Sequence, residues 1–404
     1  MIAQTAPQAV RLPAFSLFAA LLAAAGLPIY LHAPKAYVDS YGVSLAALGA
    51  VLFGLRLLDV VQDPFFGRLA GRIQARGLAV ALALGVMALS MLGLFAVTPP
   101  VSPLLWFAVT LAGVFSAYSF LTILFYAQGV ASAARLGPSG HLQLARWRET
   151  GALIGVCLAS IAPLVLGGFA GFALGFVGLC GLAYWAMRGQ WSAVVQPDGG
   201  FAPVLRDPIA RRLLVIALLN AAPVAVSSTL FLFFVESRLA LPGWEGPLLL
   251  AFFLSAALAA PLWARAALRH GARRVLLSAM VLSIGAFGGA LFLGQGDGWA
   301  FALICVASGA ALGADMVLLP ALFATRMAAI APTATSGFGL WSFVSKATLA
   351  IAALLLLPAL DLAGFTPGLS NSPQALGALS FAYAGLPCLL KAAAILLLAR
   401  LREV

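Results

Sequence analysis

The amino-acid sequence predicts an all-α membrane protein with twelve transmembrane helices arranged as two six-helix halves. Of its 404 residues, 63% are hydrophobic and only 9% are charged, whereas a soluble globular protein carries roughly 25% charged residues. Apolar runs long enough to cross a bilayer recur along the whole chain. The sequence lacks the alternating segments typical of a membrane β-barrel, which is the other structure that spans membranes. We therefore expect helices.

Twelve apolar runs define the predicted spans, and a hydrophilic interruption separates the sixth from the seventh. The spans are 12–34, 43–66, 78–98, 103–128, 145–167, 169–187, 211–235, 246–266, 273–294, 298–325, 335–361 and 376–399. The interruption runs from Arg188 to Asp207 and is rich in glycine, proline and polar residues. We therefore predict an N-terminal six-helix bundle at 1–190, a central cytoplasmic loop at 191–210 and a C-terminal six-helix bundle at 211–404.

The basic residues, which give a formal net charge of +11, lie in short gaps between the spans. Arginines gather in alternate loops and in the C-terminal tail: Arg68, Arg72, Arg76, Arg135, Arg188, Arg206, Arg211, Arg212, Arg265, Arg269, Arg273, Arg274, Arg326, Arg400 and Arg402. Cytoplasmic loops carry such an excess of basic residues. We therefore expect a multi-pass protein of the plasma (bacterial inner) membrane, with both termini in the cytoplasm and no nucleic-acid partner.

An internal repeat strengthens the division into two halves. The segment PFFGRLAGRIQARG starts at Pro64, and PLWARAALRHGARR starts at Pro261. Aligned without gaps, they match three arginines of one segment to three of the other, and both segments follow the second span of their half. Parallel repeats of six helices are the plan of the major facilitator fold, whose sites lie between the halves near the middle of the bilayer.

Three charged residues fall close together in the second span. Asp59 and Asp63 are four residues apart and Arg56 precedes Asp59 by three, so all three lie on nearly one helix face. A charged side chain at the centre of a bilayer costs about 2.5–3.5 kcal/mol. One interpretation is an ion pair that holds the second span to another helix. The other is a cation site, because paired carboxylates suit a hard cation and desolvation makes proton binding possible near neutral pH.

Further charges lie inside other spans. Lys346, in span eleven, is predicted to pair with Asp59 and Asp63 across the two halves. Asp315, in span ten, has two possible interpretations: a functional role, or a hydrogen bond between packed helices. Lys391, near the end of span twelve, is expected to extend its ammonium group to the membrane interface.

Arginines near the ends of two spans are candidates for gating. Arg68 and Arg72 follow span two, while Arg148 and Glu149 begin span five. One interpretation of Glu149 is a simple ion pair with a neighbouring arginine. For Arg148 the interpretations are that it closes a cytoplasmic gate or that it contacts an anionic substrate.

These residues resemble a known family. The stretch GVSLAALGAVLFGLRLLDVVQDPFFGRLAGR is similar to the helix-two signature of the glycoside–pentoside–hexuronide:cation symporters, the melibiose permease family, met here by Arg56, Asp59, Asp63, Pro64 and Gly67. RWRETGALIG resembles the start of the family's helix five, and LWSFVSKATLAIAALLLLPALDLAGFTPG its helix eleven. The resemblance implies that Asp59 and Asp63 form the cation site and that Lys346 lies nearby.

The sequence departs from that family where a sugar would bind. No acid occurs in FSLFAALLAAAGLPIY of span one, and Thr122 and Tyr126 stand where the family has an acid and a tryptophan in helix four. A site without those buried acceptors discriminates poorly between hydroxylated sugars, which favours a less hydroxylated or more apolar solute. Candidate lining residues, each also compatible with ordinary packing, are Tyr30, His32, Tyr118, Thr122, Tyr126, Arg148, Asn220 and Trp341.

The leading hypothesis is a symporter that couples Na⁺ or H⁺ to a sugar-like or related organic molecule by alternating access. The alternative is a lysolipid or amphiphile transporter or scramblase of the same fold. We do not expect an enzyme, because the sequence contains no nucleophile–base pair, metal-ligand spacing or phosphate loop. Apart from the coupling ion no cofactor is expected, and the expected partners are the small-molecule substrate, that cation and membrane lipid. A monomer is expected.

Overall fold

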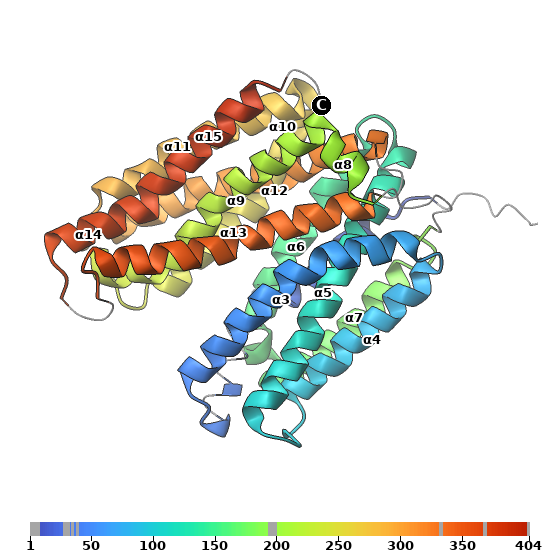
Figure 1. Ribbon diagram of the computed structural model, residues 1–404, viewed down its shortest axis with the longest axis horizontal. Coiled ribbons are helices and arrows are strands. Elements are labelled where there is room, and N and C mark those ends of the chain that lie inside the picture. Colours follow the sequence, from blue (N-terminus) through green and yellow to red (C-terminus); the bar gives the residue numbers. More distant parts are fainter. Residues whose placement is uncertain are drawn as a thin grey trace, which may run out of the picture. The chain divides into compact units, whose positions relative to one another are not determined.

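The computed structural model describes residues 9–26, 33, 36–37, 40–192, 200–330, 334–366 and 370–401. Within these ranges the ordered secondary structure is helical and includes no strand (Figure 1). The all-α fold predicted from the apolar runs is therefore confirmed.

Nine helical segments of the described chain are long and apolar enough to cross a bilayer. They are α4 (Arg76–Phe95), α5 with η1 (Pro103–Ala133, Ala134–Leu136), α7 (Phe169–Ala186), α9 with η2 (Pro208–Phe233, Phe234–Arg238), α10 (Glu245–His270), α11 with η3 (Ala272–Gly288, Gly289–Phe292), α12 (Gly298–Ile330), α13 (Thr335–Leu362) and α14–η4–α15 (Pro373–Ser380, Phe381–Gly385, Leu386–Ala399). The other three predicted spans contain α1 (Leu12–Ala24), α3 (Leu45–Arg72) and α6 (Gly140–Val165). A short α8 (Ala202–Arg206) precedes α9.

Contacts divide the chain into two compact units. The first unit comprises Met1–Phe201 together with Met327–Gly339, and the second comprises Ala202–Arg326 together with Leu340–Val404. Helix α13 therefore begins in the first unit and continues in the second. Of the predicted central loop, residues 193–199 lie outside the described part of the chain.

Small residues let helices approach closely in the first unit. At Gly155 of α6, a side-chain methyl group would lie only 2.6 Å from the Cα atom of Ala20 in α1, well inside van der Waals contact. Next to this contact, Phe18 packs on Phe125 of α5 with ring centroids 4.9 Å apart. Since lipid tails are as apolar as leucine, such close packing is a main source of helix association in membranes.

Two π-helical turns meet in the core of the second unit. Phe234 of η2 stacks on Tyr383 of η4 with ring centroids 4.2 Å apart and an interplanar angle of 12°. Phe301 of α12 packs against both rings. The aromatic cluster fixes the rotation of the η4–α15 segment, and this rotation determines which residues α15 turns toward the interior of the unit.

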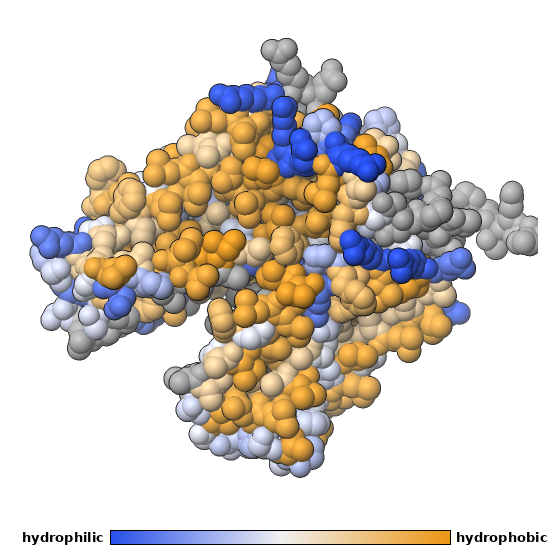
Figure 2. Space-filling model, in the orientation of Figure 1, coloured by the Kyte–Doolittle hydropathy of each residue, from blue (hydrophilic) through white to orange (hydrophobic). Residues whose placement is uncertain are grey.

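Apolar side chains also cover much of the outer surface. Figure 2 shows hydrophobic residues over the flanks of the helices and hydrophilic residues gathered near helix ends. Exposed large residues include Leu82, Leu89, Leu258 and Leu303. An outer surface of this kind matches a lipid environment.

Candidate functional site

Helix α5 carries a line of polar side chains on one face. Ser116, Ser119, Thr122 and Tyr126 are separated by three, three and four residues, the spacing that places side chains along one side of an α-helix. This line contacts α3 near Ser116 and α6 near Tyr126. The polar line is therefore a feature of the interior of the first unit.

Both carboxylates of α3 are buried and bonded to neutral polar groups. Asp59 and Asp63 are 3% and 0% exposed. The amide of Gln62 donates to Asp59 at 2.8 Å, and the hydroxyl of Ser116 donates to Gln62 at 2.9 Å. The hydroxyl of Ser119 donates to Asp63. These contacts gather several oxygen atoms, the ligand type that hard cations prefer, around the two acids.

The backbone of α3 is specialised next to Asp63. The helix begins at Leu45, where the side chain of Ser44 accepts a hydrogen bond from the Ala47 amide at 3.3 Å. Pro64 lies inside the helix and has no N–H, so the carbonyl one turn earlier loses its helical partner. Gly67 touches Gly339, because a methyl group on Gly67 would lie 3.1 Å from the Gly339 Cα atom. The start of α13 therefore packs directly on this part of α3.

The opposite end of the polar line contacts a buried ion pair on α6. Arg148 and Glu149 are 5% and 4% exposed, and the Arg148 Nε atom donates to Glu149 Oε1 at 2.7 Å. The Tyr126 hydroxyl donates to the same oxygen at 3.3 Å, and the guanidinium lies 3.8 Å above the Tyr126 ring. This cation–π contact and the ring of Phe338, 5.1 Å from that of Tyr126, hold the tyrosine in place.

Two polar atoms among the predicted site residues of this unit have no hydrogen-bond partner in the described part of the chain. They are the Nη2 atom of Arg148 and, one turn before Tyr126 on α5, the Oγ1 atom of Thr122. Buried polar atoms are normally satisfied, and an exception calls for a ligand, a water or another explanation. The arrangement can therefore donate hydrogen bonds to a polar solute.

The remaining predicted site residues of the first unit that the structure describes lie at different places on α3 and α5. Arg68 lies 4.3 Å above the ring of Phe201, while Arg72 is exposed at the end of α3. Tyr118 is partly buried in α5. Tyr30, His32 and the side chain of Arg56 lie outside what the structure describes.

Predicted site residues in the second unit lie on different helices. Asn220 of α9 is buried and accepts a hydrogen bond from Lys391 at 2.6 Å. Trp341 packs on Phe323 with ring centroids 4.8 Å apart. Lys346 is partly buried in α13. Because it belongs to a different unit from Asp59 and Asp63, its pairing with them stays a prediction.

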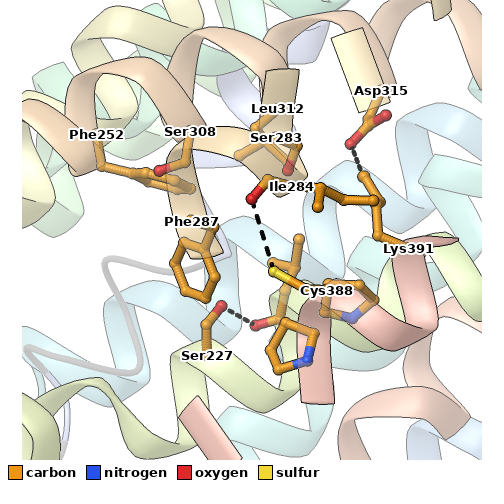
Figure 3. Close-up of a pocket in the computed structure, with 13 residues that line it drawn as sticks. Ser227, Phe252, Ser283, Ile284, Phe287, Ser308, Leu312, Asp315, Cys388 and Lys391 are labelled. Atoms are coloured by element: carbon orange, nitrogen blue, oxygen red, sulfur yellow. Dashed lines mark hydrogen bonds and ion pairs between the residues drawn. The ribbon is translucent and has the colours of Figure 1, made fainter. Parts of the chain in front are cut away.

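The expectation that Lys391 reaches the membrane interface was wrong. Its side chain is buried, with 3% of the residue exposed, and its ammonium group donates to Asp315 (Figure 3). Asp315 thus takes part in an ion pair between α12 and α15. The reason is the rotation of α15, which turns Lys391 toward the interior, where an acid lies within reach.

Three residues of the α3–α5 contact were missed in the sequence: Gln62, Ser116 and Ser119. A signal was present, because the polar residues of α5 recur at helical spacing within an otherwise apolar run. Their partners were not predictable, since the face that α5 presents to α3 depends on packing.

Long apolar helices that bury carboxylates and ion pairs inside their bundles indicate an integral, multi-pass membrane protein. Comparison with solved structures shows where this fold has been seen before. A bacterial homologue of the iron transporter ferroportin, in an outward-facing state, aligns with a TM-score of 0.72 at 17% identity, covering 97% of this chain and 100% of that chain. FucP in the outward conformation aligns with a TM-score of 0.70 at 14% identity, covering 97% and 98%.

A variant of the E. coli fucose:proton symporter FucP also aligns, with a TM-score of 0.64 at 14% identity and coverage of 97% and 98%. The family model described as MFS/sugar transport protein matches residues 14–402. The chain therefore belongs to this family of the major facilitator superfamily, and it is a transporter rather than an enzyme. A search of curated protein sequences finds no match. Membership of the melibiose permease family stays a prediction.

Proposed function

We propose that the protein is a symporter that couples Na⁺ or H⁺ to the movement of a small organic solute. The observation that carries the proposal is the burial of Asp59 and Asp63 on one helix face, beside the hydroxyl and amide groups of α5 and α3. An intramembrane acid is costly, and a bound cation offsets that cost. Release of the cation restores the energetic cost of the buried acid. A conformation that binds the cation more tightly is therefore favoured when the site is occupied.

The hydroxyl and amide groups that contact these acids suit a reversible ion. Hydroxyl and amide oxygens add ligands for Na⁺ without adding charge, and the same groups accommodate a protonated carboxyl group by rotation. Both ions therefore remain candidates. Under this proposal the positive charge of Lys346 takes the place of the ion when the ion leaves.

The solute is proposed to bind at the other end of the α5 polar line. The Nη2 atom of Arg148 and the hydroxyl of Thr122 offer hydrogen bonds, and the ring of Tyr126 holds the Arg148 guanidinium in place through the cation–π contact. A sugar-like or related organic molecule with an acidic or hydroxyl group matches these features. FucP is a fucose:proton symporter, so this fold accommodates a proton-coupled sugar.

We further propose the conventional setting for such a carrier. The protein acts as a monomer in the bacterial inner membrane, with both termini cytoplasmic, and works by alternating access. The arginines at the end of α3, Arg68 and Arg72, then lie on the cytoplasmic side and contribute to gating together with Arg148 and Glu149.

A second candidate is transport of an amphiphile such as a lysolipid. It is favoured by an apolar cavity of about 510 Å³ in the first unit, between α1, α6 and α7. Leu17, Leu158, Phe172 and Leu179 are among its lining residues. This cavity has room for part of an acyl chain, and a lipid would then present its headgroup to a polar site.

Proteoliposomes with imposed ion gradients test the proposal. Purified protein is screened with labelled sugars, organic acids and lysolipids under an inward Na⁺ gradient, an inward H⁺ gradient or no gradient. Symport predicts that one solute accumulates under one ion gradient, and that Asp59→Asn abolishes this accumulation. Asp361→Asn, which changes an exposed acid at the end of α13, is the matched control. Headgroup-dependent lipid movement that needs no gradient would instead support the second candidate.

A further inference from the structure

The second unit buries an ion pair that the proposed transport site does not use. Asp315 of α12 and Lys391 of α15 are 6% and 3% exposed. The Lys391 ammonium donates to Asp315 Oδ2 and, at 2.6 Å, to Asn220 Oδ1 of α9. Three helices thus meet at one positive charge. Removing two ions from water is expensive, and the attraction between them offsets only part of this cost.

The carboxylate of Asp315 is incompletely satisfied. Its Oδ2 atom accepts from Lys391, but its Oδ1 atom has no hydrogen-bond partner in the described part of the chain. An ionised carboxylate has about four acceptor sites, and a buried acceptor without a donor is costly. A proton bound at Oδ1 would remove both the charge of the carboxylate and its unpaired acceptor.

A small cavity lies beside this group. Asp315 and Lys391 line a cavity of about 40 Å³, together with Ser283 and Ser308 (Figure 3). One water molecule needs roughly 10–15 Å³ of such volume, so the cavity has room for a few waters and is too small for an organic solute. Its serine hydroxyls provide the polar partners that such waters need.

Few titratable groups face Asp315. Lys391 is the charged group that α15 contributes, and Cys388 of the same helix lines the cavity with a thiol. Helix α9 contributes the uncharged Asn220. The residues that α9, α10 and α11 add to the cavity lining are also uncharged: Pro223, Val224, Ser227, Phe252, Ser283, Ile284 and Phe287. Protonation is therefore governed mainly by the competition between a proton and the Lys391 ammonium.

We infer that Asp315 is a proton-binding site in the second unit, where a proton arriving through the small cavity displaces the Lys391 ammonium. A hydronium ion in the cavity transfers a proton to Oδ1 and becomes water, so one O–H bond breaks as another forms. Oδ2 is then the carbonyl oxygen of a neutral carboxylic acid, and it no longer holds the Lys391 ammonium through opposite charge. The site gains one positive charge, and Lys391 keeps its bond to Asn220. The site responds to protons whichever ion Asp59 and Asp63 bind, so it does not depend on the proposed function.

Infrared difference spectroscopy of the lipid-reconstituted protein tests this inference directly. On a shift from neutral to mildly acidic pH, we expect a carboxylic acid C=O band that Asp315→Asn abolishes and Asp361→Asn retains. The Asp315→Glu variant is expected to shift the band, which assigns it even if Asp315→Asn does not fold. A wild-type spectrum without a band that depends on Asp315 over this pH range would overturn the inference.

The Lys391→Met variant provides a second, independent readout. Without the ammonium group, we expect the Asp315 carboxyl group to be protonated already at neutral pH, with its C=O band present before acidification. If Asp315 remains ionised at neutral pH in Lys391→Met, a proton does not compete with this lysine and the inference is wrong. The double variant Asp315→Asn/Lys391→Met, which leaves no unpaired charge, serves as the folding control.

Discussion

The hydroxyl of Ser119 on α5 donates a hydrogen bond to the fully buried carboxylate of Asp63 on α3. This contact joins the polar line of α5 to the pair of acids that the sequence singles out. It gives the proposed cation site a neutral donor that is able to rotate away when an ion binds. The relationship also explains why a serine occupies this position of α5.

Replacing Ser119 with alanine is expected to weaken cation coupling without abolishing it. Once the hydroxyl has rotated, its oxygen is a ligand for the bound ion. Losing a polar contact to a charged group is worth about 1.5 kcal/mol, so the cation concentration for half-maximal transport should rise roughly tenfold. Gradient-driven uptake at varied ion concentration measures this. The control is Ser278→Ala, which removes an exposed hydroxyl of α11. An unchanged ion dependence in Ser119→Ala would exclude the hydroxyl from the site.

Two substitutions of Tyr126 separate its ring from its hydroxyl group. Tyr126→Phe keeps the ring below Arg148 and loses only the 3.3 Å bond to Glu149, so we expect the KM for the solute to change less than about threefold. Tyr126→Leu also loses the cation–π contact, worth about 1–2 kcal/mol when buried, and should raise KM about tenfold. Equal effects of the two variants on the KM of transport would show that the ring makes no contribution.

The close approach of α1 and α6 predicts a stability effect at Gly155. A leucine there would overlap the backbone of Ala20, and overpacking of this kind costs about 1–3 kcal/mol. The midpoint of thermal unfolding in detergent should therefore fall. Gly178→Ala in α7 is the matched control, since a methyl group there has no neighbour within 4 Å. A midpoint unchanged by Gly155→Leu would contradict the packing described.

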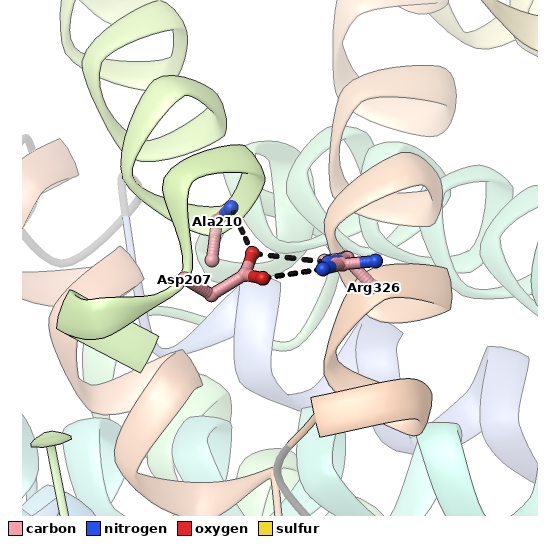
Figure 4. Close-up of polar contacts among 3 residues, drawn as sticks. All are labelled: Asp207, Ala210 and Arg326. Carbon is pink, nitrogen blue, oxygen red and sulfur yellow. Dashed lines mark hydrogen bonds and ion pairs between the residues drawn. The ribbon is translucent and has the colours of Figure 1, made fainter. Parts of the chain in front are cut away.

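The stability of the folded protein at acidic pH is expected to depend on the ionisation of Asp207. A double hydrogen bond from Arg326 holds the pKa of this carboxyl group below its ordinary value of 3.8 (Figure 4). A carboxyl group whose pKa is lower in the folded than in the unfolded state stabilises the protein at pH values above its ordinary pKa. This stabilisation is lost as the pH falls below the ordinary pKa and through the lowered pKa of the folded state. The pair is partly exposed, which makes the contribution modest.

Asp207→Asn tests this contribution without removing the helix cap. The Asp207 side chain also accepts from the Ala210 amide at 2.7 Å and so caps α9, a role that asparagine performs equally well. We expect a lower unfolding midpoint than wild type at neutral pH and equal midpoints well below the ordinary pKa. A constant difference between the two proteins at every pH would indicate that the ion pair is not responsible.

The sequence predicted the class of fold because hydrophobic length and charge depletion directly reflect the bilayer. It also identified Asp59, Asp63 and Arg148 as charges within apolar runs, and the structure buries all three. It did not identify Ser119 or Gln62, since their partners depend on how α3 and α5 are rotated against each other. Lys391 was mispredicted for the same reason. Its position near the end of the span suggested that its side chain reaches the membrane interface, whereas the packing of α15 on α9 turns the side chain toward the interior.

A comparison of two modes of transport tests the proposed coupling of cation binding to solute movement at Asp63. Asp63→Asn and wild-type protein are assayed in the same proteoliposomes for gradient-driven accumulation of the solute and for solute exchange without a gradient. We expect Asp63→Asn to lose accumulation while exchange persists, because the solute site is intact and the coupling ion no longer binds. Accumulation at the wild-type level in Asp63→Asn would show that Asp63 does not couple the ion to the solute.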